Sequence, residues 1–256
     1  MASYFIYDSI NQYRSDNTVS EGQMTDSVTP TFSASDTLIS HERANDQNIG
    51  TTISGIADRD AIEYAVGSSA TADAAAVYFT GDDGVSSGTI MTFFIDTDRA
   101  SLPSKGTISA VSAAGWAVAD LTETTGDKFF TEFNASVSNV SEILIGRKLN
   151  FEVEPDVNVQ SSIDYNNEIN SSLGGVEYSI NVNPGQEVIT ISFQNISSTF
   201  KANLITMQDA LKGEATKFLY FDGSSFHWVR LDKPMVMSEI ADGRFSTQIV
   251  LRQQIQ

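Results

Sequence analysis

The chain has 256 residues, of which 41% are apolar and 10% aromatic, so it can bury a substantial core in one large or two ordinary domains. Its formal net charge of −18 argues against nucleic-acid binding, which depends on Lys and Arg neutralising phosphates. The absence of cysteine excludes disulfides, thiolate metal sites and a cysteine nucleophile.

The acidity is concentrated in the first part of the chain. Residues 1–154 hold 22 acidic and 8 basic residues, and residues 155–256 hold 11 and 7, which gives −14 and −4. We interpret this surface as a source of solubility and of resistance to nonspecific association. No secretory signal is visible, and no stretch approaches 18 uninterrupted apolar residues, so we expect no membrane partner.

The chain begins with a short aromatic strand, SYFIYDSI (residues 3–10), which we expect to be tied into the body of a domain rather than offered to a partner. Residues 31–63 then alternate short apolar pairs with Asp, Asn and Gly, as in a β-domain with long loops. His41 lies there with no second ligand candidate nearby, so we interpret it as a surface or hydrogen-bonded residue.

The clearest strands of this half are residues 74–80 and 89–95, separated by the turn at residues 81–84. This pattern predicts a long hairpin in the centre of a sheet. Asp96 and Asp98 follow it with the alternating acidic spacing that begins calcium loops, although the Gly and terminal Glu of an EF-hand loop are absent. They are the only metal-ligand candidates, and the alternative is that they are turn residues facing water.

Residues 107–152 complete the first half. Trp116 predicts a half-buried strand, and Phe129, Phe130 and Phe133 are candidate core or interface anchors. The adjacent basic residues at 147 and 148 are interpreted as a solvated hairpin tip, with contact to an acidic neighbour as the alternative.

Proline, polar residues and a change in charge density coincide at residues 155–159, which predicts domains at 1–153 and 154–256. In the second domain, alternating apolar residues around the sequence NPGQ predict a hairpin over residues 175–193. The last alternating segment, residues 245–251, predicts a final strand.

The stretch from residue 187 to residue 231 predicts a strand, a helix and an aromatic hairpin. The helix is expected at about residues 198–212, with an N-cap among residues 197–199 and Gly213 at its end. The hairpin turns at residues 222–225. Four apolar residues spaced by four, three and four should cover one face of the sheet: Phe200, Leu204, Met207 and Leu211.

We find no motif that predicts an enzyme. The serine elbow, the phosphate loop, the dinucleotide-binding glycine pattern and the zinc-binding helix are all absent. His227, on a predicted strand, is interpreted as hydrogen-bonded to backbone rather than as half of an acid–base pair with Asp222 or Asp232. We therefore expect no catalytic residues and no cofactor; a hydrolase with dispersed carboxylates is the remaining enzymatic alternative.

The C-terminal region resembles the distal tail and baseplate-ring proteins of tailed bacteriophages. The resemblance lies in the order of SSLGGVEYSINVNPGQEVITISFQNIS, TFKANLITMQDALKG, TKFLYFDGSSFHWVRLDKPMVM and ADGRFSTQIVLRQQ. It implies a β-rich, ring-forming domain with one helix in a non-enzymatic virion protein. Such a protein is assembled in the host cytoplasm, forms a homo-oligomeric ring, and joins the tail tube to the baseplate hub or to fibres.

The first half is similar to galactose-binding-like jelly-roll β-sandwiches, with EILIGRKLNFEVEPDVNV resembling their closing strands. The segment ISGIADRDAIEYAV lacks the Trp expected of that family, so no ligand residue is transferred. The sequence therefore predicts a mainly β protein: a jelly-roll sandwich followed by a smaller β-rich domain with one helix. The alternative function is a carbohydrate-binding module for receptor recognition.

Overall fold

The computed structural model describes most of the chain, in two compact units. One unit contains residues 1–5 and 150–255, and the other contains residues 6–149. We call them the C-terminal and N-terminal units, and we describe each by itself. The described residues are 2–7, 18–24, 32–34, 47–96, 102–155, 160–164, 167–171, 177–181 and 185–254.

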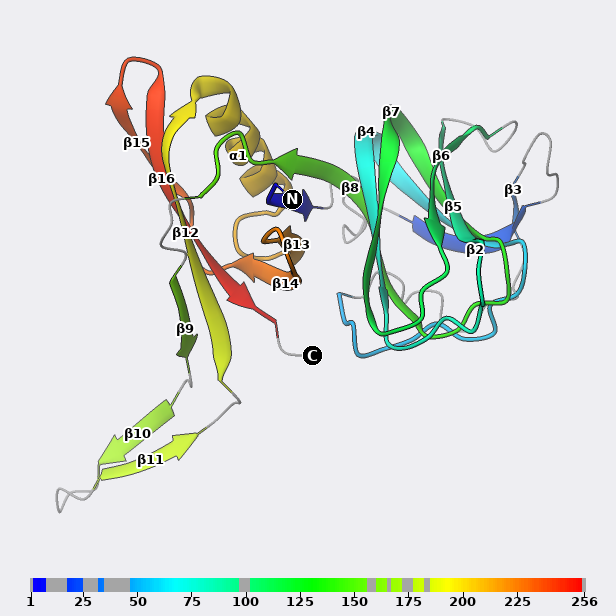
Figure 1. Ribbon diagram of the computed structural model, residues 1–256, viewed down its shortest axis with the longest axis horizontal. Coiled ribbons are helices and arrows are strands. Elements are labelled where there is room, and N and C mark those ends of the chain that lie inside the picture. The colour runs from blue at the N-terminus through cyan, green and yellow to red at the C-terminus, as the bar shows by residue number, and fades with distance from the viewer. Residues whose placement is uncertain are drawn as a thin grey trace. The chain divides into compact units, whose positions relative to one another are not determined.

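The N-terminal unit is built on antiparallel strands. Along the sheet the order is β6-β5-β7-β4-β8, while β2 pairs with β4 and β3 pairs with β2 (Figure 1). The strands are β2 (Thr18–Met24), β3 (Phe32–Ala34), β4 (Asp60–Phe79), β5 (Thr89–Asp96), β6 (Ser104–Ser109), β7 (Gly115–Phe133) and β8 (Val140–Asn150).

Two long strands, β4 and β7, form the frame of this unit. They pair with each other from Ala61 to Phe79, with register shifts that mark bulges. The first part of β4 also pairs with β2 and its last part with β8, so the two ends of β4 have different partner strands. Gly126 allows the close approach at one bulge, because a Cβ there would lie 2.8 Å from the carbonyl oxygen of Asp96.

Successive residues of these strands point to opposite faces, and over several stretches both faces are buried. The predicted anchors Phe129, Phe130 and Phe133 are fully buried. Phe129 and Phe133 belong to the main cluster, whereas Phe130 packs in a smaller one with Ala61 and Phe94. Trp116 is half-buried, as predicted.

The predicted central hairpin of residues 74–80 and 89–95 is wrong. Both strands form, but β7 lies between β4 and β5, so they do not pair with each other. The intervening loop is held elsewhere by Asp83, whose buried carboxylate accepts hydrogen bonds from the backbone of Val85 at 2.6 Å and of Val111 at 2.5 Å. Because Asp83 fixes this loop, the chain does not have to turn back beside β4, and β5 pairs with β7.

The interpretation of Arg147 and Lys148 as a hairpin tip is also wrong. Both lie within β8 and have acidic partners. Arg147 contacts Asp73 at 3.2 Å, and Lys148 contacts Asp120 at 2.7 Å. Burial raises the pKa of Asp73, and the backbone N–H of Lys148 and the charge of Arg147 oppose that rise. The basic pair therefore ties β8 to neighbouring strands.

The C-terminal unit is a second antiparallel sheet with one helix. Its order is β13-β14-β16-β12-β9, and β15 pairs with β16 beside β14. The elements are β1 (Tyr4–Tyr7, of which the first two residues belong here), β9 (Gln160–Asp164), β10 (Asn167–Ser171), β11 (Glu177–Asn181), β12 (Gln186–Ser197), α1 (Ser198–Ala210), β13 (Phe218–Phe221), β14 (Phe226–Leu231), β15 (Val236–Ala241) and β16 (Arg244–Gln253).

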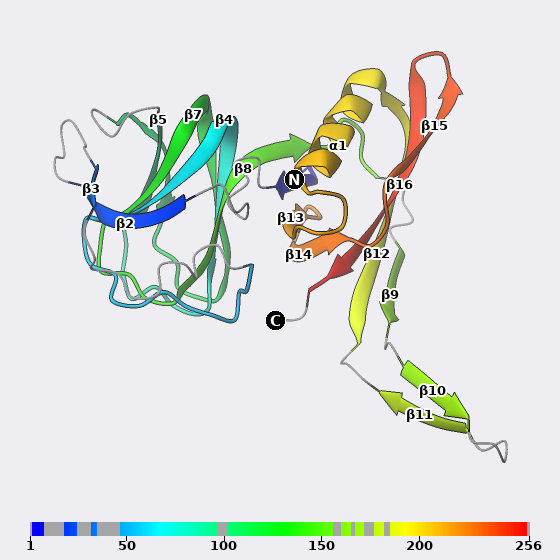
Figure 2. The ribbon, with the colours of Figure 1, turned by 180° about the vertical axis from the view of Figure 1, so that it is seen from behind.

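The predicted helix is confirmed, and α1 lies against one face of β12 and β16 (Figures 1 and 2). Ser197 is its N-cap and accepts a hydrogen bond from the backbone N–H of Phe200 at 3.1 Å. After the helix, Gly213 has a φ of 68°, a conformation that favours glycine. The four predicted face residues are buried: Phe200, Leu204, Met207 and Leu211.

The aromatic strand at the N-terminus is tied into this unit, as expected. The Phe5 ring lies 4.7 Å from that of Phe151 and 5.4 Å from that of Phe218, both edge-on. The Phe151 ring in turn meets that of Phe193 at 4.9 Å. Edge-on pairs of this kind stabilise a core beyond the area they bury.

The predicted hairpin over residues 175–193 is wrong in its pairing. The strands β11 and β12 form, but β11 pairs with β10, and β12 pairs with β9 and β16. The NPGQ sequence therefore does not close a hairpin between β11 and β12. Instead, β9 and β10 together run against β11 and β12 (Figure 2).

Candidate assembly surface

Two strands form the opposite ends of the four-stranded run β15-β16-β12-β9. In the described residues, β9 pairs only with β12 and β15 only with β16. Every side chain of β9 is exposed, and all those of β15 are exposed except the half-buried Met237. Edge strands present unpaired backbone N–H and C=O groups to solvent, and natural proteins usually protect them with charges, prolines or bulges.

These two edges have an acidic residue each, and β15 has a bulge, but both also carry exposed apolar side chains. The exposed fraction is 72% for Val236, 58% for Ile163 and 54% for Ile240. Of the large apolar residues exposed in the described part of the chain, one other, Ile205, lies on α1. We call β9 and β15, with these residues, the edge surface.

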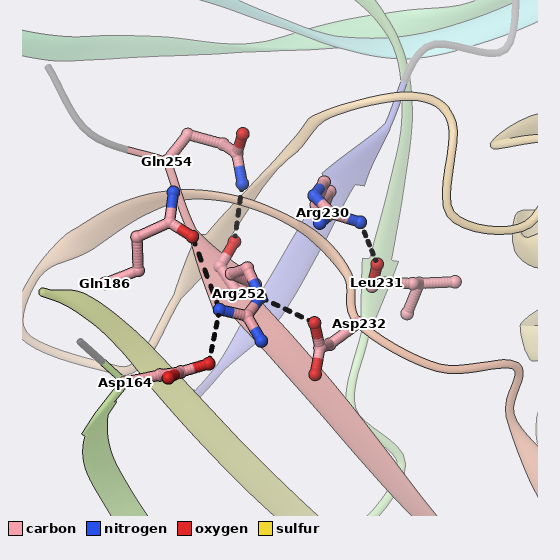
Figure 3. Close-up of polar contacts among 7 residues, drawn as sticks. All are labelled: Asp164, Gln186, Arg230, Leu231, Asp232, Arg252 and Gln254. Atoms are coloured by element: carbon pink, nitrogen blue, oxygen red, sulfur yellow. Dashed lines mark hydrogen bonds and ion pairs between the residues drawn. The ribbon is translucent and has the colours of Figure 1, made fainter. Parts of the chain in front are cut away.

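A single arginine contacts both the end of β9 and the residue that follows β14 (Figure 3). Arg252, on β16, donates from Nε to Asp232 at 2.6 Å and from Nη1 to Asp164 at 3.0 Å and to Gln186 at 3.3 Å. The hydrogen bond to Asp232 raises the pKa of Arg252, and burial opposes this. The Arg252 side chain thus spans the sheet from the end of β14 to β9.

Strand β9 is also held by its backbone and by a side-chain contact with β12. Its backbone pairs with β12 from Gln160 to Asp164, and the Ser161 hydroxyl donates to the Glu187 carboxylate. No β9 side chain is buried, so apolar packing adds nothing to its attachment. The Arg252 contact therefore has a larger share in positioning β9 than it would have in a buried strand.

The predicted calcium candidates are not brought together in a described site. Asp96 lies at the end of β5, opposite Lys128 of β7, and Asp98 lies outside the described residues, as does His41. The described part of the chain contains no group of three acidic or histidine residues able to hold a metal ion. Calcium binding at Asp96 and Asp98 stays a prediction.

His227 contacts a side chain, contrary to the prediction of a backbone partner. Its Nε2 lies 2.9 Å from Oδ2 of Asp222, while Oδ1 of Asp222 accepts from the backbone of Ser224 and Ser225, both at 2.7 Å. Burial alone would raise the pKa of Asp222, but His227 and these N–H groups hold it below its usual range. The group closes the β13–β14 turn.

The Tyr220 ring stacks on the His227 imidazole, with centroids 5.7 Å apart. Burial raises the pKa of Tyr220 to about 12, and the charge of Asp222 adds to the rise. The phenol therefore stays protonated at neutral pH. The contacts of His227 with Asp222 and Tyr220 are those that close a turn.

In the N-terminal unit, a half-buried tryptophan lies against a buried tyrosine. Trp116 at the start of β7 lies opposite Tyr78 of β4, with ring centroids 5.3 Å apart and planes at 58°. Tyr78 is buried and Trp116 half-buried. An accessible indole of this kind offers a flat apolar surface to a ligand.

Sequence reasoning missed the edge surface and its arginine. Asp164, Gln186, Asp232 and Arg252 are far apart in the chain, and the alternation that predicts a strand does not show which strands end a sheet. The available signal was small: Ile163 interrupts a polar run, SSIDY, and Val236 and Ile240 follow a proline.

In the described residues, no helix is long and apolar enough to cross a membrane. No protein-family model and no curated protein sequence matches the chain.

Two solved structures are similar in part. The carbohydrate-binding module CBM32 of AlyQ, in complex with 4,5-unsaturated mannuronic acid, is 15% identical with a TM-score of 0.33, over 53% of this chain and 95% of that one. Truncated AlyQ with CBM32 and alginate lyase domains is 14% identical with a TM-score of 0.36, over 82% of this chain and 56% of that one.

The predicted fold class, mainly β with one helix, is confirmed by the structure, and both neighbours contain a carbohydrate-binding module. Neither is described as a phage protein. At this identity and TM-score the likeness assigns no ligand and no activity to the chain.

Proposed function

We propose that the chain is a non-catalytic structural protein that forms homo-oligomers through its edge surface. The observation that carries the proposal is the exposure of Val236, Ile163 and Ile240 on two open strands of one sheet. Open edges with apolar side chains are templates for pairing with another chain. Pairing satisfies the edge backbone and removes apolar surface from water.

The specific form we propose is a ring at the tail tip of a tailed phage, joining the tail tube to the hub or to fibres. It is supported by the resemblance in the order of elements over residues 171–254. On this proposal the protein is a component of the virion, so mass spectrometry of purified particles should find it in a fixed ratio to the tube protein. Particles that lack it would contradict the tail assignment.

Mass photometry and light scattering test the assembly itself. The unaltered protein should be multimeric at micromolar concentration. The variant Ile240→Lys should shift toward monomer, because a charge would replace an apolar side chain at the contact. Ile205→Lys is the matched control: its side chain is 44% exposed on α1, away from the edges, and the variant should stay multimeric. A strictly monomeric unaltered protein would contradict the proposal.

A second candidate function is carbohydrate binding by the N-terminal unit, as in receptor recognition. The half-buried Trp116, whose ring is tilted against that of Tyr78, favours it, because sugar rings pack on aromatic faces. A glycan array that includes uronate oligosaccharides, probed with and without calcium, should then give signals that Trp116→Ala abolishes. Silence under both conditions, or signals unchanged in the variant, would remove this candidate.

A further inference from the structure

We propose that β9 of one copy pairs with β15 of a second copy, antiparallel, so that the C-terminal sheets of successive copies join into one sheet. The inference rests on the assembly function proposed above and names the contact that produces it. The two strands lie at opposite ends of the same four-stranded run. Each copy therefore offers one edge of each kind, and the contact is head-to-tail.

Strand direction agrees with this arrangement. Strand β9 is antiparallel to β12, β12 to β16, and β16 to β15. Strand β15 therefore runs opposite to β9. A neighbour in the same orientation presents its β15 antiparallel to β9, as in every other pairing of this sheet. The strands also match in length, with five residues in β9 and six in β15.

The faces of the two strands select a register. Ile163 lies opposite Glu187, on the sheet face of the buried Ile189. Met237 lies opposite Thr247, on the face of the buried Phe193. Both belong to the face that packs against α1. Placing Ile163 beside Met237 keeps both faces continuous and joins two apolar side chains, whereas a slip of one residue would put the α1 faces of the two copies on opposite sides of the joined sheet.

Charge supports the same register. This register places Asp164, the last residue of β9, beside the start of β15 in the next copy, and the exposed Lys233 precedes that strand. Pairing two β15 strands about their centre would instead bring two Glu239 carboxylates close together, and like charges across strands are destabilising. Pairing two β9 strands would leave Val236 and Ile240 exposed to water. Self-pairing is therefore less favourable than the head-to-tail contact.

The contact also implies a displacement between copies. Within one copy, Ser162 of β9 pairs with Val188 of β12, which pairs with Arg252 of β16, so Ser162 and Arg252 lie at the same height in the sheet. Ser238 of β15 pairs with Ser246 of β16 and lies at the height of that residue. These heights differ by about six residues, or roughly 20 Å at the rise of a strand. Successive copies are thus staggered along the strand direction, as neighbouring strands of a barrel are.

Engineered cysteines test the contact, and the chain has no native cysteine to interfere. In the proposed register Ser162 faces Ser238 of the next copy, within reach of a disulfide. Under mild oxidation, Ser162→Cys and Ser238→Cys should each stay unlinked alone. An equal mixture should give covalent dimers, and the double variant should give a ladder of higher multimers. Ser162→Cys mixed with Thr206→Cys, on the exposed side of α1, controls for random collision.

Three results would overturn the inference. The first is linkage of either single variant to itself as efficiently as in the mixture, which indicates self-pairing. The second is multimers in light scattering without linkage between positions 162 and 238, which leaves the assembly function standing and removes this contact. The third is a monomeric protein throughout, which removes both.

Discussion

At the scale of single residues, Arg252 is the side chain on which the geometry of the edge depends. Its guanidinium is 18% exposed and contacts Asp232, itself 15% exposed, and Asp164, which is 46% exposed. The more exposed contact is screened by solvent and contributes less. Because β9 has no buried side chain, even a modest contribution decides how long the strand stays paired.

Replacing Arg252 by Met should loosen β9 without unfolding the unit. Met keeps the apolar part of the side chain but leaves Asp164 and Asp232 without their cation. We expect amide hydrogen exchange in residues 160–164 to become up to about fivefold faster, which corresponds to about 1 kcal/mol. Exchange in α1, which makes no contact with the arginine, should be unchanged.

Arg230→Met is the matched control. Arg230 lies directly opposite Arg252 in the sheet and donates to the Leu231 carbonyl at 3.3 Å, with no carboxylate in the contacts that the structure describes. This variant loses the same charge and should leave exchange in β9 unchanged. Equal acceleration in both variants would show that overall charge, and not the Arg252 contacts, controls the strand.

At the scale of elements, the sequence predicts what depends on neighbouring residues. The helix over about 198–212 carries its own signals: an N-cap serine at Ser197, an apolar stripe, and Gly213 at its end. The β13–β14 turn is likewise local, because Asp222 bonds to the backbone two and three residues further on. Both were predicted for the physical reasons that hold in the structure.

Strand pairing depends on partners far away in the chain, and there the sequence was a poorer guide. Residues 74–80 and 89–95 form strands, but the residues between β4 and β5, 80–88, give no sign of β7, which separates the two strands in the sheet. In the same way, β11 and β12 are consecutive strands that pair with different partners. Local turn signals identify where a chain reverses, and long-range packing decides which strands meet.

The edge surface could not be predicted for the same reason. An alternating segment looks alike whether it ends a sheet or lies inside it, so the exposure of Ile163 and Val236 follows only from the pairing. The partners of Arg252 come from three other segments, and no spacing in the sequence links them. The candidate calcium pair, Asp96 and Asp98, could be identified from the sequence because its two carboxylates are only two residues apart.

At the scale of the whole molecule, charge and edge pairing act against each other. Each copy carries a net charge of −18, so identical chains repel one another at long range. The contact proposed for β9 and β15 consists mainly of backbone hydrogen bonds, with one pair of apolar side chains, Ile163 and Met237, and one acidic residue on each strand. Salt screens the repulsion between copies but weakens such a contact little.

Assembly should therefore become stronger as salt is added. Between about 0.01 M and 0.15 M ionic strength the Debye length falls from about 30 Å to about 8 Å, which removes most of the repulsion between acidic surfaces. Light scattering across this range should show a growing multimer fraction at fixed protein concentration, and Ile205→Lys should respond as the unaltered protein does. Dissociation of the multimer by salt would instead indicate association through opposite charges, which would contradict a contact made by the edges of the sheet.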